Sequence, residues 1–276
     1  MYSAIIDGLC KDKQIPKAQN LFEEMICKGV EPNVITYNSI IQGVCSLGMR
    51  MDAESYVNKM VNSGVSPNIV TFYIMIDALC KDGMTKKAQT LLELMSTRSV
   101  RPDVVTYTSL IDGLCNSSQW EEATKFFREM MGRGISPDVC IFNILIDAIC
   151  KEGMVEKAHE LLDLMIERDV EPNTITYNAL MDGYCSHSLM EETNKVLHSM
   201  VVRGCEPDAI SYTILINGYC KAKMLDEAMR AFEDMPSKGL TPNAITYNSL
   251  IDGLCKVRRV AAALELFEKM QARGKL

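Results

Sequence analysis

The sequence lacks the features of a membrane protein, a disulfide-bonded secreted protein or a zinc protein. No apolar stretch approaches 18 residues, so we predict no membrane-spanning helix and expect no membrane partner. The N-terminal residues resemble neither a secretory signal nor an Arg-rich transit peptide. The 11 cysteines are odd in number and include no Cys-x-x-Cys pair, which argues against a disulfide framework and a zinc cage. A reducing compartment is therefore indicated.

Residues typical of catalytic sites are also scarce. The three histidines are scattered, and the chain lacks the His-x-Glu and Cys-x-x-Cys combination that a nucleotide deaminase needs. No glycine-rich phosphate-binding loop is present, and the net charge of −7 argues weakly against binding a polyanion. We therefore expect a protein that is not an enzyme and that uses no metal or cofactor.

What the sequence does have is a period of 35 residues, kept without an insertion or deletion. The recurring cysteines are Cys10, Cys45, Cys80, Cys115, Cys150, Cys185, Cys220 and Cys255. Methionines from Met25 to Met270, prolines from Pro32 to Pro242 and aromatic residues from Tyr2 to Tyr247 keep the same interval. Such a period is typical of a solenoid. We expect a single array with units at 1–33, 34–68, 69–103, 104–138, 139–173, 174–208, 209–243 and 244–276, of which the first and last are truncated.

Each unit has the pattern of two short helices. In the unit 104–138, apolar residues recur at three- and four-residue steps from Tyr107 to Cys115 and again from Trp120 to Met130. Gly134 marks the end of the second helix. Helices of about twelve residues are marginal alone in water, so stacking of neighbouring pairs is needed to bury their apolar stripes. We therefore predict an all-α, superhelical α-solenoid of about eight helix-turn-helix repeats.

The recurring cysteines lie on the predicted buried stripe of each first helix. Each follows the aromatic residue by eight positions, and a small apolar thiol suits a close approach of two helices. Packing is therefore the favoured interpretation, with metal or redox chemistry as the alternative.

A second stripe of the first helix carries a different pattern. We number each unit from 1 to 35 and call its last position the closing slot. The second slots are Ile35, Val70, Val105, Cys140, Ile175, Ile210 and Ile245. The fifth slots are Ser3, Asn38, Tyr73, Thr108, Asn143, Asn178, Thr213 and Asn248. The closing slots are Asn33, Asn68, Asp103, Asp138, Asn173, Asp208 and Asn243.

This stripe admits two interpretations. Asn and Asp at the closing slot suit helix N-caps, and capping alone would account for these residue types. It does not explain why the fifth slot, one and a half turns inside the helix, favours Asn over better helix formers. Short polar side chains interleaved with apolar ones would suit an unpaired base, which needs an apolar surface for its face and hydrogen bonds for its edge.

The repeats closely resemble the pentatricopeptide repeat family over the whole chain. The resemblance is carried by VVTYTSLIDGLC at 104–115 and by NAITYNSLIDGLCK at 243–256. It implies a right-handed superhelix of the P-class, similar to plant restorer-of-fertility proteins. It also implies that each repeat binds one base of single-stranded RNA, with the N-terminal unit at the 5′ end. The fifth and closing slots would read the base edge, and the second slots would stack against the base.

Pair by pair, the resemblance implies a target. Ser3 with Asn33 implies A, Asn38 with Asn68 implies C or U, and Tyr73 with Asp103 is assigned no base. Thr108 with Asp138 implies G, Asn143 with Asn173 implies C or U, and Asn178 with Asp208 implies U. Thr213 with Asn243 implies A, and Asn248 alone implies a pyrimidine. The implied target is 5′-AYNGYUAY-3′.

Lysines at the thirteenth slot are implied to contact phosphate, and solvated ion pairs are the alternative. They are Lys11, Lys81, Lys151, Lys221 and Lys256. Organellar RNA processing or stability, a location in the mitochondrion or else the chloroplast, and protein processing factors as further partners are also implied by the resemblance alone. The rival function is a protein-binding helical-repeat scaffold, because such repeats also form peptide-binding surfaces.

Overall fold

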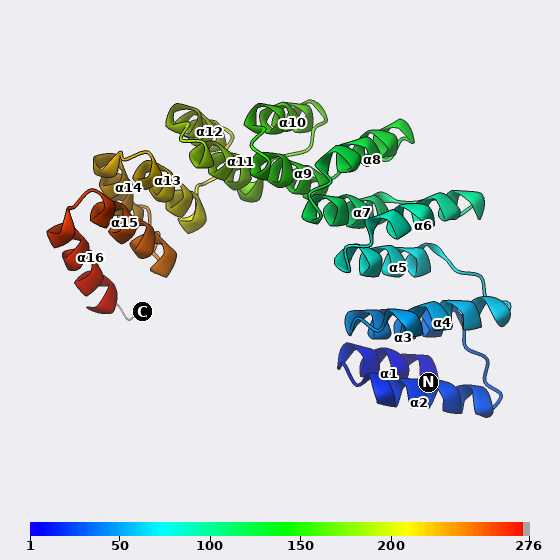
Figure 1. Ribbon diagram of the computed structural model, residues 1–276. Helices are drawn as coiled ribbons and strands as arrows, with labels where there is room; N and C mark the ends of the chain where they lie inside the picture. Colours follow the sequence, from blue (N-terminus) through cyan, green and yellow to red (C-terminus); the bar gives the residue numbers. More distant parts are fainter. Residues whose placement is uncertain (273–276) are drawn as a thin grey trace. The chain divides into compact units, whose positions relative to one another are not determined.

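The structure, a computed structural model, describes residues 1–272, and this part contains helices joined by short turns and no strand (Figure 1). The helices are α1 (Tyr2–Lys11), α2 (Ile15–Cys27), α3 (Val34–Ser46), α4 (Arg50–Asn62), α5 (Ile69–Lys81), α6 (Thr85–Thr97), α7 (Val104–Asn116), α8 (Trp120–Gly132), α9 (Val139–Lys151), α10 (Val155–Glu167), α11 (Thr174–Ser186), α12 (Met190–Val202), α13 (Ala209–Lys221), α14 (Leu225–Ser237), α15 (Ala244–Lys256) and α16 (Val260–Ala272). Each predicted unit thus contains one helix pair, and the prediction of an all-α helical-repeat solenoid is confirmed.

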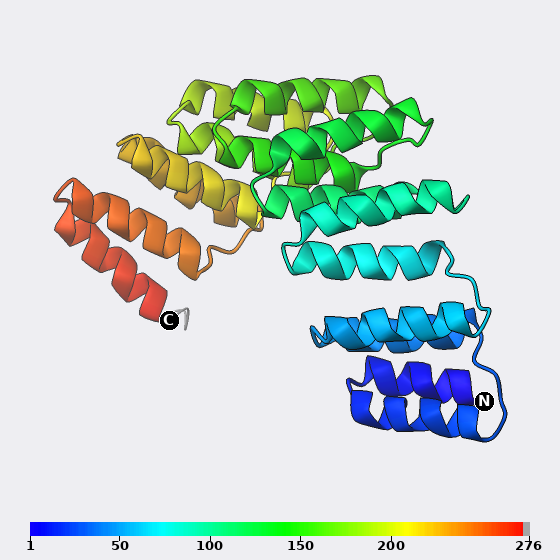
Figure 2. The same ribbon diagram turned by 45° about the vertical axis from the view of Figure 1, so that its right-hand side comes forward.

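The helix pairs are grouped into two compact units, which divide between Pro137 and Asp138. In the first unit, α1, α3, α5 and α7 pack side by side in sequence order, and each carries its own second helix (Figure 2). In the second unit, α9, α11, α13 and α15 do the same. The first helices therefore form one layer and the second helices another within each unit. None of the helices in the described range has the length and apolar character that crossing a membrane would require.

The closing-slot residues cap the first helices, as capping preference predicts. The Asn68 side chain accepts the backbone N–H of Thr71 at 3.1 Å, and each of the other closing slots caps the first helix of the repeat that follows it in the same way. At the other end of the pair, Gly134 has a φ of 74°, where a residue with a Cβ is strained. A side-chain cap therefore marks the start of the helix pair, and a left-handed residue marks its end, which is Gly134 in this repeat and Ser99 or Asp169 in two others.

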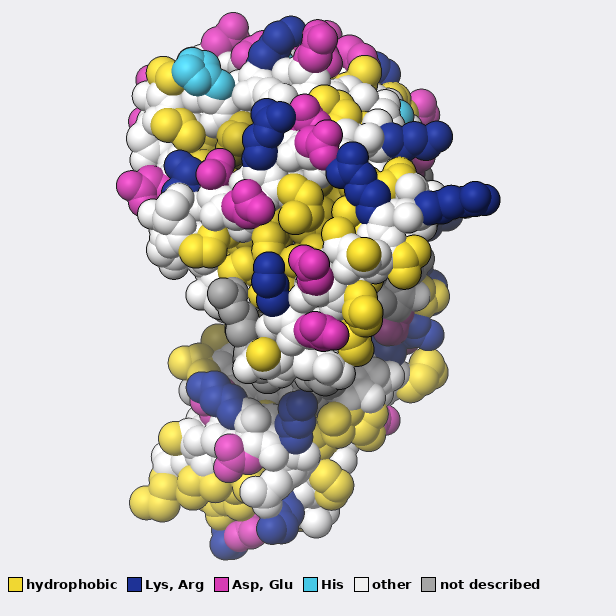
Figure 3. Space-filling model, turned by 90° about the vertical axis from the view of Figure 1, so that its left-hand side faces the viewer, with side chains coloured by type: hydrophobic (Ala, Val, Ile, Leu, Met, Phe, Trp, Pro, Cys, Tyr) yellow, Lys and Arg dark blue, Asp and Glu magenta, His cyan; other side chains and the backbone are white. Residues whose placement is uncertain are grey.

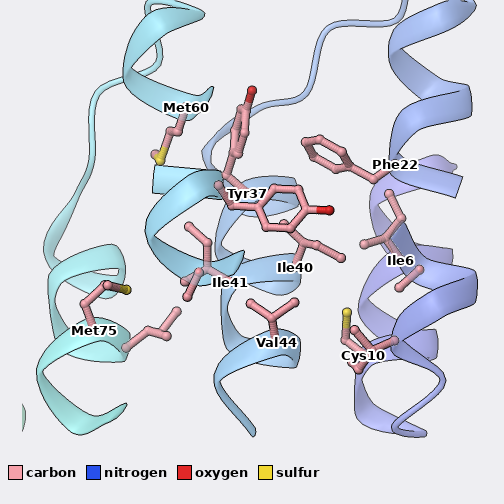
Figure 4. Close-up of a cluster of buried hydrophobic side chains, with 14 of the residues drawn as sticks. Ile6, Cys10, Phe22, Tyr37, Ile40, Ile41, Val44, Met60 and Met75 are labelled. Atoms are coloured by element: carbon pink, nitrogen blue, oxygen red, sulfur yellow. The ribbon is translucent and has the colours of Figure 1, made fainter. Parts of the chain in front are cut away.

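The core of the first unit is built from the periodic aromatic and aliphatic residues. Tyr37 is 1% exposed and meets Phe22 edge to face, with ring centroids 5.3 Å apart. Figure 4 shows this pair between the helices, with Ile40 and Val44 continuing the stripe along α3. Edge-to-face packing adds to the hydrophobic gain from burial. Each apolar stripe is thus covered by its partner helix and by the next repeat.

The prediction that the recurring cysteines are buried is confirmed for Cys10, Cys80, Cys150 and Cys185. It is wrong for Cys255, which is exposed, and Cys45, Cys115 and Cys220 are half-buried. Burial raises the pKa of the Cys80 and Cys150 thiols to about 12, which leaves them protonated and unreactive at neutral pH. No group of three metal-binding side chains comes together among residues 1–272.

A glycine of the following repeat explains why the cysteine is small. A Cβ added at Gly43 would lie 2.6 Å from the Cys10 Sγ, and one at Gly183 would lie 2.6 Å from the Cys150 Sγ. The tenth slot therefore lets neighbouring first helices approach closely. Where Ala78 replaces the glycine, α5 contacts α3 less extensively than other adjacent first helices contact each other within the two units. The sequence pattern did not lead us to this glycine.

Candidate nucleic-acid interface

The second slots are exposed, as expected for a surface that could stack against a base. Ile35 is 64% exposed and Ile245 is 65% exposed, although both lie in the first turn of a helix whose opposite face is buried. Cys140, the one cysteine in this position, is also exposed. Exposing large aliphatic side chains at the same position of successive repeats creates an apolar edge within each unit.

The fifth slots are less exposed than the sequence suggested. Asn38 and Asn178 are each 8% exposed. The reason is that the fifth slot is hydrogen-bonded to the closing slot of its own repeat. The amide of Asn38 donates to Asn68 Oδ1 at 3.1 Å, and that of Asn178 donates to Asp208 Oδ1 at 3.4 Å. The structure therefore brings together the two positions that the resemblance pairs.

The same pairing recurs in the repeat 139–173. The Asn143 amide donates to Asn173 Oδ1 at 3.3 Å. The three pairs with Asn at the fifth slot thus share one geometry, and they occur in both compact units. A repeated polar pair beside a repeated apolar side chain is the arrangement that the sequence pattern predicted.

A third residue, which the sequence analysis missed, completes each pair. The hydroxyl at the third slot of the following repeat donates to the oxygen of the fifth-slot amide. The bonds are Thr71 to Asn38 at 2.7 Å, Thr176 to Asn143 at 2.6 Å and Ser211 to Asn178 at 2.6 Å. The recurrence of Thr or Ser at this slot was the available signal, and it resembles an ordinary helix-capping preference.

In two repeats with a hydroxyl at the fifth slot, the third-slot hydroxyl of the following repeat connects the fifth slot to the closing slot. Ser3 lies 2.7 Å from the Thr36 hydroxyl, which in turn donates to Asn33 at 3.0 Å. Thr213 and Asn243 are joined in the same way through Thr246. The pairs that the resemblance assigns to A are therefore bridged, whereas the three pairs with Asn at the fifth slot are bonded directly.

The remaining fifth slots differ. Tyr73 is half-buried, and Asp103 serves as the cap of α7 by accepting the Thr106 N–H at 2.9 Å. Thr108 donates to the carbonyl of Val104 in its own helix at 2.7 Å, and Asn248 is exposed. These repeats lack the amide pair described above.

Asp208 is ionised at neutral pH. Burial, the largest single effect, raises its pKa, but hydrogen bonds from the Ser211 backbone and hydroxyl and from the Asn178 amide together lower it below its ordinary value of 3.8. The carboxylate therefore carries only acceptor atoms, unlike the amide at the same place in Asn68.

Four of the five thirteenth-slot lysines form ion pairs one helical turn away. The pairs are Lys11–Asp7, Lys81–Asp77, Lys151–Asp147 and Lys256–Asp252, each with Nζ 2.6 Å from a carboxylate oxygen. Lys221 follows Asn217 instead, and it lines a pocket of about 270 Å³ together with Lys256. A phosphate would therefore compete with an acid for each of the four paired lysines. The competition is modest, because exposed ion pairs of this kind are weak.

Charge of one sign does not dominate the visible surface. On the face drawn in Figure 3, Lys and Arg side chains are interspersed with Asp and Glu, and no large basic area stands out. A ligand held mainly by phosphate contacts would need such an area.

Taken with the fold, these features define an α-helical repeat protein with a recurring polar pair, formed by the fifth-slot residue of one first helix and the cap residue of the next. The profile of the PPR repeat family matches the chain in eight overlapping stretches: 1–46, 32–81, 74–116, 102–140, 137–186, 172–221, 208–256 and 242–275. The chain belongs to this family. No curated protein is similar enough to the chain to count as a match.

Solved structures show the same fold. Pentatricopeptide repeat protein PPR10 in complex with an 18-nt psaJ RNA element is 28% identical, with a TM-score of 0.82 over 100% of this chain and 40% of that one. The pentatricopeptide repeat protein PPR10 from maize is 24% identical, with a TM-score of 0.66 over 99% of this chain and 49% of that one. The PPR domain of Arabidopsis thaliana protein-only RNase P 1 in complex with tRNA is 17% identical, with a TM-score of 0.55 over 71% of this chain and 100% of that one. The chain thus spans less than half of the PPR10 chains that it matches.

Proposed function

We propose that the chain binds single-stranded RNA in a sequence-specific manner, with one base at each repeat and without catalysis. The observation that carries this proposal is the directly bonded fifth-slot and closing-slot pair, which recurs beside an exposed aliphatic residue. The similarity to PPR10 in complex with RNA supports the same function. The eight repeats would act as one array that runs in parallel with the RNA.

The chemistry of the pairs supports the pyrimidine assignments. Asn178 keeps one amide N–H beyond the one given to Asp208, and the Asp208 carboxylate supplies acceptors. A uracil edge carries a donor at N3 between two acceptor oxygens, so it complements this set. Asn68 offers amide N–H groups instead, which suit the N3 of cytosine or an oxygen of uracil.

The exposed second-slot residues would hold the base by its faces. Contact between a base face and an apolar side chain tolerates any of the bases, because each of them has a flat face. Ile175 and Ile210 precede and follow the Asn178–Asp208 pair in sequence, and both are exposed. Affinity would therefore come from stacking together with contacts from the thirteenth-slot lysines, whereas selectivity would come from the pairs.

The full assignment gives the target 5′-AYNGYUAY-3′, with the pairs as set out from the sequence. We further propose that the chain is of the P-class, similar to restorer-of-fertility proteins, and that it acts in organellar RNA processing or stability. The mitochondrion is the proposed location, with the chloroplast as the alternative, and protein processing factors are proposed as further partners. These points rest on family resemblance.

Selection from a random RNA pool tests the proposal. We expect enrichment of the eight-base target in the stated order and polarity. A variant with Asn143→Ala and Asn178→Ala should lose enrichment at the fifth and sixth bases only. Absence of enrichment, together with capture of peptides from a parallel library, would overturn RNA binding in favour of a protein-binding scaffold.

A further inference from the structure

We propose that the third-slot hydroxyl of each following repeat is a positioning residue for base selectivity, acting through the fifth-slot amide. Thr71, Thr176 and Ser211 hold this role for Asn38, Asn143 and Asn178. The inference rests on the proposed function, because it concerns how the same site selects a base.

The orientation of the Asn38 amide follows from the capping bond. Asn68 Oδ1 accepts the backbone N–H of Thr71 at 3.1 Å, so this atom is an acceptor. The Asn38 atom that faces it at 3.1 Å is therefore the amide nitrogen. The amide oxygen of Asn38 then faces the Thr71 hydroxyl, which must donate to it.

The hydroxyl hydrogen has a choice of acceptors, and distance decides it. Thr71 Oγ1 lies 2.7 Å from Asn38 Oδ1 and 3.1 Å from Asn68 Oδ1. Since a hydroxyl has one hydrogen to donate, the shorter contact takes it. The Thr71 oxygen also accepts the backbone N–H of Asn68 at 3.2 Å. The hydroxyl is thus fixed on both sides and holds the amide in one orientation.

Helix capping does not require this hydroxyl. In α9 the third slot is Ile141, yet Asp138 still accepts its backbone N–H at 3.0 Å. The cap therefore forms with an apolar side chain in this position. An additional role is needed to account for the short hydroxyl contacts to the fifth slot.

The hydroxyl cannot contact RNA itself. Thr71 is 2% exposed and Ser211 is 0% exposed. The effect of the hydroxyl on a base must therefore pass through the amide. Because the hydroxyl binds the amide oxygen, the remaining amide N–H is the group offered to a ligand. That donor complements the O2 acceptor of a pyrimidine. Without the hydroxyl, only the 3.1 Å bond to Asn68 would hold the amide, its oxygen would lose its partner, and selection of a pyrimidine over a purine would weaken.

Replacing the hydroxyl tests the proposal in two separate units. In Thr71→Val and Ser211→Ala chains, we expect the pyrimidine-to-purine affinity ratio to fall about three- to tenfold, at the second base and the sixth base respectively, since one hydrogen bond is lost. Ratios at the other bases should stay unchanged. Thr71→Ser and Ser211→Thr keep a hydroxyl at each position, so they should show the affinity ratio of the unaltered chain.

Thr106→Val is the matched control. Thr106 donates to the cap Asp103 at 2.8 Å, but the fifth slot of the preceding repeat is Tyr73, which has no amide. This variant loses a hydroxyl at the same slot together with its bond to the cap, and no base ratio should change. Thermal unfolding of all variants reports that structural component.

The outcomes separate the two proposals. If the unaltered chain shows no pyrimidine preference at the second and sixth bases, the proposed reading of bases fails. If it shows the preference and Thr71→Val and Ser211→Ala retain it, the positioning role alone is wrong. A fall of the ratio that Thr71→Ser does not restore would also overturn it, because the hydroxyl would not be the cause.

Discussion

Gly113 in α7 lies where two first helices approach, and its replacement by alanine gives a direct measure of that packing. An added Cβ would overlap the Cβ of Cys80 and lie 2.6 Å from its Sγ and 3.1 Å from its Cα. Relieving such an overlap by a helix shift costs about 1–3 kcal/mol. Alanine regains about 1 kcal/mol of helix propensity. We therefore expect Gly113→Ala to lower the free energy of unfolding by up to about 2 kcal/mol.

Gly8 provides the matched control for this prediction. It occupies the same tenth slot in α1, but a Cβ there would meet nothing within 4 Å. Gly8→Ala should therefore raise the free energy of unfolding by about 0.5–1 kcal/mol. Urea denaturation followed by far-UV circular dichroism compares the two. Equal stability of the Gly113→Ala and Gly8→Ala chains would refute the close cysteine–glycine packing.

Three further predictions concern the ligand and the titrating groups. The slope of log K against log salt for RNA binding should be no steeper than about −4, because five lysines at about −0.7 each give about −3.5; a steeper slope would reveal a basic surface that the account lacks. Alkylation of the native chain should label the exposed Cys27, Cys140 and Cys255 before Cys80, and target RNA should protect Cys140 but not Cys27. Equal labelling of Cys140 with and without RNA would contradict its place against a base. Because the pKa of Asp208 is lowered from 3.8, its charged form persists as pH falls, so the preference for U at the sixth base should be equal at about pH 7 and about pH 5. Loss of the preference within that range would exclude the carboxylate as the acceptor.

Much of the fold was predictable from the sequence because the signals are periodic and local. The interval from Cys10 to Cys255 established the register, and the apolar spacing in 104–138 predicted two helices. Asn and Asp before each first helix predicted caps, which the structure shows at Asn68 and Asp138. Such features depend on a few neighbouring residues, so one sequence is enough to reveal them.

Contacts between repeats were harder to predict. The pairing of Gly43 with Cys10 joins residues 33 positions apart, and glycine inside a helix has no single meaning in sequence. The Thr71 hydroxyl was missed for a related reason, since its bond to Asn38 crosses from one repeat to the next. The unexpected burial of Asn38 has the same origin, because the third-slot and closing-slot residues cover it. The stacking of repeats, and not helix propensity, determines these contacts.

The central claim is that the fifth and closing slots select a base, and Asp208→Asn tests it most directly. The substitution replaces a carboxylate by an amide of the same shape beside Asn178, so a donor appears where uracil N3–H needs an acceptor. Competition binding with 5′-AYNGYUAY-3′ RNAs that differ only at the sixth base should show the U-to-C ratio falling about tenfold or more, as one well-placed base contact is worth about 1–3 kcal/mol. Asp103→Asn, which makes the same charge change in the repeat of Tyr73, should leave that ratio as it is. An unchanged preference for U in the Asp208→Asn chain, with RNA affinity intact, would contradict the account.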